Sequence, residues 1–195
     1  KHWPNSDYEM IKATTSYYLN EDKPFMTYYM TVSGHLNYNF SGNNMASRNK
    51  SKVKDLELKN SIKAYYATQI ELDKAMEELL KQLEESGKLN DTLIVIAPDH
   101  YPYGLTTKDM NTVSKIDRND KFENYHTSLI MYNPQMEKTE INKVISSLDI
   151  LPTIYNLYGL EYDSRLLMGK DIFSDDEHIV IYHSAEPKEE SKKEE

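Results

Sequence analysis

Residues 92–100 read TLIVIAPDH, a hydrophobic run that ends in an acidic residue and a histidine. The β-branched content of the run predicts a buried strand, and Asp99 and His100 then lie at its carboxyl end. Open α/β sheets place their ligand sites at this end of their strands. A carboxylate oxygen beside an imidazole nitrogen suits a divalent cation that polarises phosphate or sulfate oxygens. The alternative is a solvated Asp99 beside a structural His100.

The rest of the chain alternates helical and apolar extended patterns, which predicts an α/β layered domain with a mainly parallel sheet. The longest helix is expected from Val53 or Asn60 to Glu85, and Gly87 is well placed to stop it in a left-handed C-cap. The other expected elements are a helix over 7–19, strands over 25–32, 93–97, 126–132 and 179–182, loops over 36–51 and 101–124, and short helices over 141–158 ended by Gly159.

The composition excludes several classes of function. The chain has 195 residues with 32 acidic and 23 basic side chains, and this acidic balance argues against a general nucleic-acid binder. It has no cysteine, which removes disulfides, thiolate metal sites and a cysteine nucleophile. No apolar stretch approaches the roughly 20 residues of a membrane span. The length suits one domain, expected over residues 1–185, and the charged segment 186–195 is predicted to be a disordered tail.

A second candidate ligand, His35, follows the predicted strand over 25–32. If this strand neighbours the one before Asp99 in a parallel sheet, His35, Asp99 and His100 project toward the same crevice. A metal held by Asp99 and His100 would neutralise a tetrahedral anion, while His35 would hydrogen-bond the same group or protonate a leaving oxygen. The alternative is that His35 is a solvated turn residue after Gly34.

Other polar or aromatic candidates carry weaker signals. The segment Tyr101 to Gly104 is expected at the rim of the site, where its aromatic rings would either stack on a substrate or pack a turn. His126, at the start of a predicted strand, is expected to be structural, and His178 has no acidic companion at metal-ligand spacing in the sequence. No Gly-rich phosphate loop, Gly-x-Ser-x-Gly elbow or His-Glu-x-x-His helix is present.

Taken in order, these motifs resemble the lipoteichoic acid synthases, phosphoglycerol transferases of the sulfatase and alkaline phosphatase superfamily. The similarity runs from about Trp3 to Ser174. It is carried by Lys23–Phe25 before a strand, Thr31–His35, a helix containing Gln69–Asp73, Asp99–Tyr101, Asp149–Thr153, Gly159–Leu160 and Leu167–Phe173.

The resemblance implies an alkaline phosphatase-like layered sheet with helices on both faces, present here as the carboxyl-terminal part of the catalytic domain. It implies that Asp99 and His100 ligate a divalent metal, typically manganese, with magnesium or zinc as the other choices, and that His35 contacts a phosphoglycerol head group. Asp149 lies in a motif of structural character. Pro98 departs from the family, which often has Gly before this Asp.

The resemblance also implies what this chain lacks. The family's nucleophilic Thr and another acidic metal ligand come from the amino-terminal half of the domain, and no segment here resembles it. No residue of this chain is therefore assigned as the nucleophile, and the 195 residues alone are expected to bind metal weakly and turn over nothing.

The implied function is transfer of glycerol phosphate from a lipid head group such as phosphatidylglycerol to a glycerol phosphate polymer. The implied location is the extracellular face of the cell membrane of a Gram-positive-type bacterium, with the anchor outside this chain. One rival is a sulfatase, or a phosphoethanolamine transferase or phosphodiesterase, on the same metal platform. The other is a non-catalytic module that binds an anionic glycopolymer or a protein partner.

Overall fold

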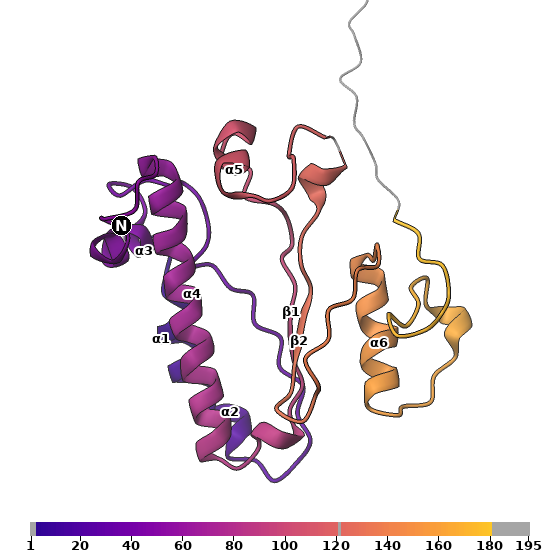
Figure 1. The fold of residues 1–195 in the computed structure, drawn as a ribbon. Helices are drawn as coiled ribbons and strands as arrows, with labels where there is room; N and C mark the ends of the chain where they lie inside the picture. The colour runs from indigo at the N-terminus through magenta and orange to yellow at the C-terminus, as the bar shows by residue number, and fades with distance from the viewer. Residues whose placement is uncertain (1–2, 121, 181–195) are drawn as a thin grey trace, which may run out of the picture. The chain divides into compact units, whose positions relative to one another are not determined.

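The computed structural model describes residues 3–120 and 122–180 (Figure 1). The chain forms two compact units, the first ending at Met136 and the second beginning at Glu137. The expected tail over 186–195 lies outside the described residues. No helix in the described ranges is long and apolar enough to cross a membrane.

Helix α4, Asn60–Glu85, is the central element of the first unit, as the sequence predicts. Its buried side chains repeat at helical spacing, and Ile62, Ala75 and Leu83 are among them. The helix ends at Gly87, whose φ of 72° places it in the left-handed region. The N–H of Gly87 donates to the Glu84 carbonyl and the N–H of Lys88 to the Leu83 carbonyl, both at 2.9 Å. This pairing is a Schellman motif, and it confirms the predicted C-cap.

Three short helices cover α4. The expected helix over 7–19 is present as α1, Asp7–Thr14, and α2, Ser16–Leu19, which pack their apolar side chains on the carboxyl-terminal half of α4. Helix α3, Asn44–Asn49, corrects the prediction of a loop over 36–51. It forms because the Asn43 side chain caps it, accepting the Ala46 N–H at 2.9 Å, and because Met45 and Ala46 are completely buried.

The sheet differs from the prediction in its direction. Strands β1, Ile94–Ile96, and β2, Ile130–Tyr132, pair antiparallel, with Val95 opposite Met131. They are the only strands in the described residues, and β1 is half-buried rather than buried. The segment between β1 and β2, expected to be irregular throughout, contains helix α5, Thr107–Val113. The chain is thus a mixed α/β partial domain, but its parallel sheet was wrongly predicted.

The segment over 25–32 shows why the parallel strand was predicted and is not formed. Its side chains alternate only in part: Phe25 and Tyr29 pack on the α1–α4 cluster and Met26, Tyr28 and Met30 are 92%, 80% and 75% exposed, but Thr27, on the face of Phe25 and Tyr29, is exposed as well. The segment runs extended along α4 beside β1 (Figure 1). The pattern of exposed and packed side chains goes with an extended backbone. A β-ladder also needs a neighbouring strand as its hydrogen-bond partner, and the described residues supply none for this segment.

The second unit is organised around α6, Ile150–Leu157, and the carboxylate of Asp149 just before it. Asp149 accepts the backbone N–H of Ser146 and of Lys170, both at 2.8 Å, so it ties two turns to the start of the helix. Gly159, with φ of 62°, ends the helix as predicted. Ile179 and Val180 form no strand, and the remainder of the strand expected over 179–182 lies outside the described residues.

Candidate functional site

Asp99 and His100 lie just beyond β1, on an exposed loop. The Asp99 side chain is 90% exposed and that of His100 is 42% exposed. Asp99 Oδ1 lies 3.6 Å from His100 Nε2, so the two predicted ligand atoms converge on one point of the surface. A separation of this size is compatible with shared coordination of a cation.

The tautomer of His100 is fixed by a local hydrogen bond. His100 Nδ1 lies 2.7 Å from the backbone carbonyl of Tyr101. A carbonyl can only accept, so Nδ1 carries the proton and Nε2 keeps a free lone pair in the neutral ring. Metal-binding histidines are oriented by such an N–H donation from the other ring nitrogen. Nε2, the nitrogen that faces Asp99, is therefore the one prepared to bind a metal.

The spacing of the two donors fits a divalent cation. Two bonds of about 2.1 Å at a tetrahedral angle place their donor atoms roughly 3.4 Å apart. The observed 3.6 Å between Asp99 Oδ1 and His100 Nε2 is close to this value. No cluster of three or more His, Cys, Asp or Glu side chains at metal-binding distance occurs over residues 3–120 and 122–180. The described chain therefore offers two of the ligands that a metal site needs.

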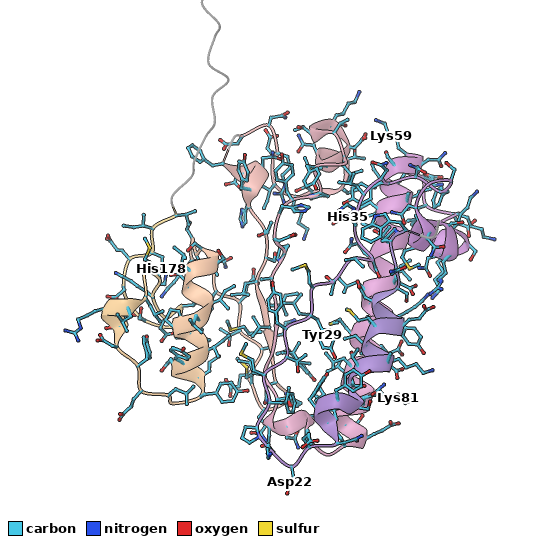
Figure 2. The ribbon with its side chains drawn as sticks, turned by 180° about the vertical axis from the view of Figure 1, so that it is seen from behind. Asp22, Tyr29, His35, Lys59, Lys81 and His178 are labelled. Carbon is cyan, nitrogen blue, oxygen red and sulfur yellow. The ribbon has the colours of Figure 1, made fainter. Side chains whose placement is uncertain are left out.

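His35 lies in a tightly held turn rather than at the end of a paired strand. Its backbone N–H donates to the Val32 carbonyl at 3.0 Å, and its own carbonyl accepts from Asn43 Nδ2 at 2.9 Å. The carboxylate of Asp7 accepts the N–H groups of Val32 and Ser33, both at 2.9 Å. The turn is thus fastened to both α1 and the start of α3. In Figure 2, His35 lies toward the Lys59 end of α4, while Asp22 lies toward the Lys81 end.

The His35 ring has the same tautomer as His100. Its Nδ1 lies 2.8 Å from the carbonyl of Leu36, which fixes the proton on Nδ1 and leaves Nε2 open. The exposed ring also lies against the indole of Trp3, with 5.5 Å between ring centroids and an interplanar angle of 71°. His35 can therefore accept a hydrogen bond from a hydroxyl or, when protonated, donate one to an anion.

The loop after His35 and the loop after His100 pack directly on one another. A Cβ atom added to Gly104 would lie 2.9 Å from Cε2 of Tyr38 and 3.1 Å from Cβ of Leu36. Burial, together with the nearby Tyr65, Tyr103 and Asp99, raises the pKa of Tyr38 to about 12. Two of those neighbours, Tyr103 and Asp99, belong to the loop that carries the two candidate ligands. The two loops meet by close packing and not at a shared sheet edge, and convergence of the His35, Asp99 and His100 side chains on one crevice stays a prediction.

The packing alternative for the Tyr101–Gly104 segment holds for Tyr101, while stacking of an aromatic ring on a substrate stays a prediction. Tyr101 packs on the core cluster and meets Tyr103 and Tyr125 edge-on, with centroid distances of 6.3 and 5.5 Å. Tyr103 is 52% exposed, and its ring centroid lies 4.4 Å from that of His100. Tyr101 therefore packs the turn, while Tyr103 lines the rim beside the ligand pair.

His126 and His178, the other histidines of the described ranges, each have an acidic neighbour. His126 Nδ1 lies 2.8 Å from Glu123 Oε2 at the surface. His178 of the second unit has an acidic neighbour that its sequence surroundings do not reveal: its Nδ1 lies 3.4 Å from Asp149 Oδ2, with both side chains buried. Burial alone would raise the pKa of Asp149, but hydrogen bonds from the backbone N–H groups of Ser146 and Lys170, together with the nearby His178 ring, lower it. Asp149 is a structural anchor, in agreement with the character of its motif.

Sequence reasoning missed the residues that hold His35. Asp7 reads as the first turn of a helix and Asn43 as part of a polar loop, and both are 1% exposed. The only available signal for Asn43 was its place before a short run with helix-forming residues, typical of an N-cap. Nothing in the sequence around Trp3 indicates that its ring meets His35.

A sulfatase family model matches residues 2–160. The chain belongs to the sulfatase family. It is 28% identical over 180 residues to a lipoteichoic acid synthase of Staphylococcus saprophyticus, an alignment that covers 90% of this chain and 27% of that protein. It is 25% identical over 176 residues to a lipoteichoic acid synthase of Staphylococcus aureus, covering 88% of this chain and 26% of that protein. The chain thus spans about a quarter of the length of these relatives, and the family resemblance read from the motifs is confirmed.

Proposed function

We propose that this chain is the carboxyl-terminal part of a metal-dependent phosphotransferase that moves glycerol phosphate from a phosphatidylglycerol-type lipid to a glycerol phosphate polymer. The observation that carries the proposal is the 3.6 Å approach of Asp99 Oδ1 to His100 Nε2, with the His100 lone pair directed by its Nδ1–H bond. The sulfatase family match and the two lipoteichoic acid synthases support the reaction class.

Asp99 and His100 would hold a divalent cation, with manganese as the first choice and magnesium or zinc as the others. When bound, such an ion stabilises negative charge on phosphate oxygens and activates an oxygen nucleophile. The neutral Nε2 of His35 accepts a hydrogen bond from a glycerol hydroxyl, and the protonated ring donates one to a phosphate oxygen or to the leaving oxygen. The exposed Tyr103 ring lies beside His100, with 4.4 Å between the ring centroids.

The chemical step uses a nucleophile from the part of the enzyme that this chain does not contain. A Thr hydroxyl would attack phosphorus, the bond from phosphorus to the diacylglycerol oxygen would break, and that oxygen would take up a proton. A terminal hydroxyl of the polymer would then attack the phosphothreonine and release the Thr. The proposed setting is the extracellular face of the membrane of a Gram-positive-type bacterium.

The test is to make Asp99→Ala and His100→Ala in the full-length protein and measure polymer formation from phosphatidylglycerol in the presence of manganese. Loss of a metal ligand removes several kcal/mol of transition-state stabilisation, so each variant is expected to lose activity by about 100-fold or more. Tyr17→Ala, at a 77% exposed position on α2, is the matched control and is expected to retain activity. Unchanged activity in both ligand variants would refute the assignment.

The same platform supports a second enzymatic candidate, because a carboxylate–imidazole metal pair also suits sulfate esters and other phosphodiesters. A sulfatase needs a Cys or Ser that becomes formylglycine, whereas a transferase uses a Thr, so the residue upstream of Lys1 at the nucleophile position separates the two. A non-catalytic module that binds an anionic glycopolymer or a protein is the third possibility. Calorimetry with manganese on the full-length protein tests it, since absence of binding that depends on Asp99 and His100 would favour such a module.

A further inference from the structure

We propose that Trp3 is a second contact for the substrate head group, and that Trp3 and His35 together bind the phosphate ester of a short polyol. The inference rests on the proposed function, because it extends the head-group site that His35 is assigned to. The observation behind it is the placement of an exposed indole against the exposed His35 imidazole, from a segment 32 residues earlier in the chain.

The Trp3 ring is not used as core packing. It is 49% exposed, whereas the adjacent Pro4 is fully buried and the core of the unit is formed by other residues. The backbone and Pro4 therefore anchor this segment, and half of the indole surface is left open. An aromatic ring held at the surface with one side free has the form of a ligand contact, because its large apolar face loses little flexibility on binding.

One short helix holds the backbone of both residues in place. The N–H of Asn44, the first residue of α3, donates to the Trp3 carbonyl at 2.9 Å. The side chain of Asn43, which caps the same helix, donates to the His35 carbonyl at 2.9 Å. The relative position of Trp3 and His35 is thus fixed by neighbouring residues of α3 before a ligand arrives. Because the backbone at both residues is already ordered, less conformational entropy is lost when a ligand binds between them.

The two rings offer complementary chemistry. His35 Nε2 is open because Nδ1 bonds the Leu36 carbonyl, so it meets a hydroxyl or a phosphate oxygen. The indole supplies an apolar surface for carbon atoms and one N–H donor. A molecule with a phosphate and hydroxyls on a carbon chain of two or three atoms matches both. Glycerol phosphate has this chemistry, whether it is free or part of a lipid head group.

The composition of the chain provides a direct probe. Trp3 is the only tryptophan, so the tryptophan emission of the 195-residue chain reports this position alone. The experiment titrates the chain with glycerol phosphate, with inorganic phosphate, and with glycerol. The expected result is a saturable change in Trp3 emission with glycerol phosphate at an affinity at least fivefold tighter than with either part alone. Equal or absent responses to all three would overturn the proposal.

Substitutions show which residues are responsible for the change in Trp3 emission. His35→Ala is expected to weaken the glycerol phosphate response at least fivefold, whereas Tyr17→Ala, the exposed control on α2, is expected to leave it intact. Vesicles of phosphatidylglycerol, compared with vesicles of phosphatidylcholine, separate the two sources of the ligand. A response to phosphatidylglycerol vesicles assigns the site to the lipid donor, and a response to soluble glycerol phosphate alone assigns it to the polymer end. A response unchanged by His35→Ala would contradict the joint site.

Kinetics of the full-length protein provide a second, independent readout. Trp3→Ala is expected to raise KM for the lipid about tenfold while lowering kcat by much less, the signature of lost binding that is equal in the ground and transition states. Trp3→Phe keeps an aromatic face and is expected to recover most of the affinity. If Trp3→Ala does not fold, the Trp3→Phe variant and the emission titration of the unmodified chain still decide the question. An equal loss of kcat with KM unchanged would overturn the proposal.

Failure of the proposed function and failure of the Trp3 site would give different experimental results. If Asp99→Ala and His100→Ala left full-length activity unchanged while glycerol phosphate still altered Trp3 emission through His35, the metal assignment would fall and the Trp3 site would stand. If both ligand variants lost activity but Trp3 emission did not respond to glycerol phosphate, the metal assignment would stand and the Trp3 site would fall.

Discussion

Asp7 and Ser33 hold one another by reciprocal hydrogen bonds: Asp7 Oδ2 accepts the Ser33 N–H at 2.9 Å, and Ser33 Oγ accepts the Asp7 N–H at 2.9 Å. The second oxygen of Asp7 accepts the Val32 N–H, so one buried carboxylate satisfies two backbone donors of the turn before His35. The start of α1 is therefore hydrogen-bonded directly to the turn that carries His35, the candidate head-group ligand.

Asp7→Ala is expected to lower the free energy of unfolding by about 2–4 kcal/mol, because it leaves two backbone N–H groups without acceptors in a largely buried place. Urea denaturation followed by circular dichroism measures the change. The control is Glu9→Ala, two residues along α1, whose side chain is 63% exposed and pairs with Arg48. That change is expected to cost less than about 1 kcal/mol. Equal stability of the two variants would show that the Asp7 bonds do not hold the turn.

Glu71 gives the first unit a defined acid sensitivity. Its side chain is 1% exposed, and burial alone would raise its pKa. Hydrogen bonds from Ser6, Asn49 and Lys74, together with the charge of Lys74, outweigh burial and lower the pKa from 4.5 to about 2. Because the folded state holds the ionised form, the stabilisation is fully present above the unfolded pKa and is lost as pH falls from about 4.5 toward 2. The difference corresponds to about 3 kcal/mol.

Glu71→Gln, which cannot ionise, is expected to lack this acid-dependent step. The measurement is the urea midpoint of the variant and of the unmodified protein at several acidic pH values. The difference between the two midpoints should narrow as pH falls. Glu85→Gln, at a side chain that is 65% exposed, is the matched control and should follow the unmodified chain. If the difference in urea midpoint between the Glu71→Gln variant and the unmodified protein were the same at every pH, Glu71 would not be the source of the acid sensitivity.

Local patterns predicted α1, α4 and α6, but they missed α3 and α5 and predicted the sheet poorly. The periodicity of α4 and the glycines after α4 and α6 are short-range signals, and Gly87 and Gly159 have the left-handed backbone expected of them. Strand direction and partners are long-range properties. An apolar run such as β1 reads the same whether its neighbour is parallel or antiparallel, so a parallel sheet was inferred from the order of elements alone.

The candidate site also has features that depend on adjacent residues and features that depend on residues far apart in the sequence. The approach of Asp99 to His100 is a property of adjacent residues and was predictable from the dipeptide. The hydrogen bonds that hold the turn before His35 were not predictable, because Asp7 and Ser33 are 26 residues apart and belong to segments with unrelated patterns. The packing of Gly104 on Tyr38 joins two loops far apart in the sequence, and no periodicity reports such a contact.

Gly104→Ala tests the packing that joins the two halves of the site. The new methyl group would lie 2.9 Å from Cε2 and 3.0 Å from Cδ2 of Tyr38, whose side chain is 8% exposed and has little room to move. Overpacking of this kind costs about 1–3 kcal/mol and shifts the backbone. The free energy of unfolding should fall by this amount, and full-length activity should fall more than that loss of folded protein explains, because His100 moves relative to His35.

The matched control is Gly87→Ala, at the far end of α4. Nothing lies within 4 Å of a Cβ at this position, and the cost arises from its positive φ instead. This variant is expected to lose about 1 kcal/mol of stability and to retain activity per folded molecule. If Gly104→Ala had full activity per folded molecule, close packing of the two loops would not matter for the site.

Metal binding by the 195-residue chain itself is expected to be weak, because Asp99 and His100 are two donors where a stable site uses four or more. Titration with manganese, followed by electron paramagnetic resonance of the free ion, should give a dissociation constant of about millimolar or weaker. Asp99→Ala and His100→Ala should each abolish it. His126→Ala is the matched control, since His126 also lies beside a carboxylate at the surface, that of Glu123, at 2.8 Å. If His126→Ala weakened binding while His100→Ala did not, the cation would be held by the second pair, and the proposed role of β1 in presenting the metal ligands would be wrong.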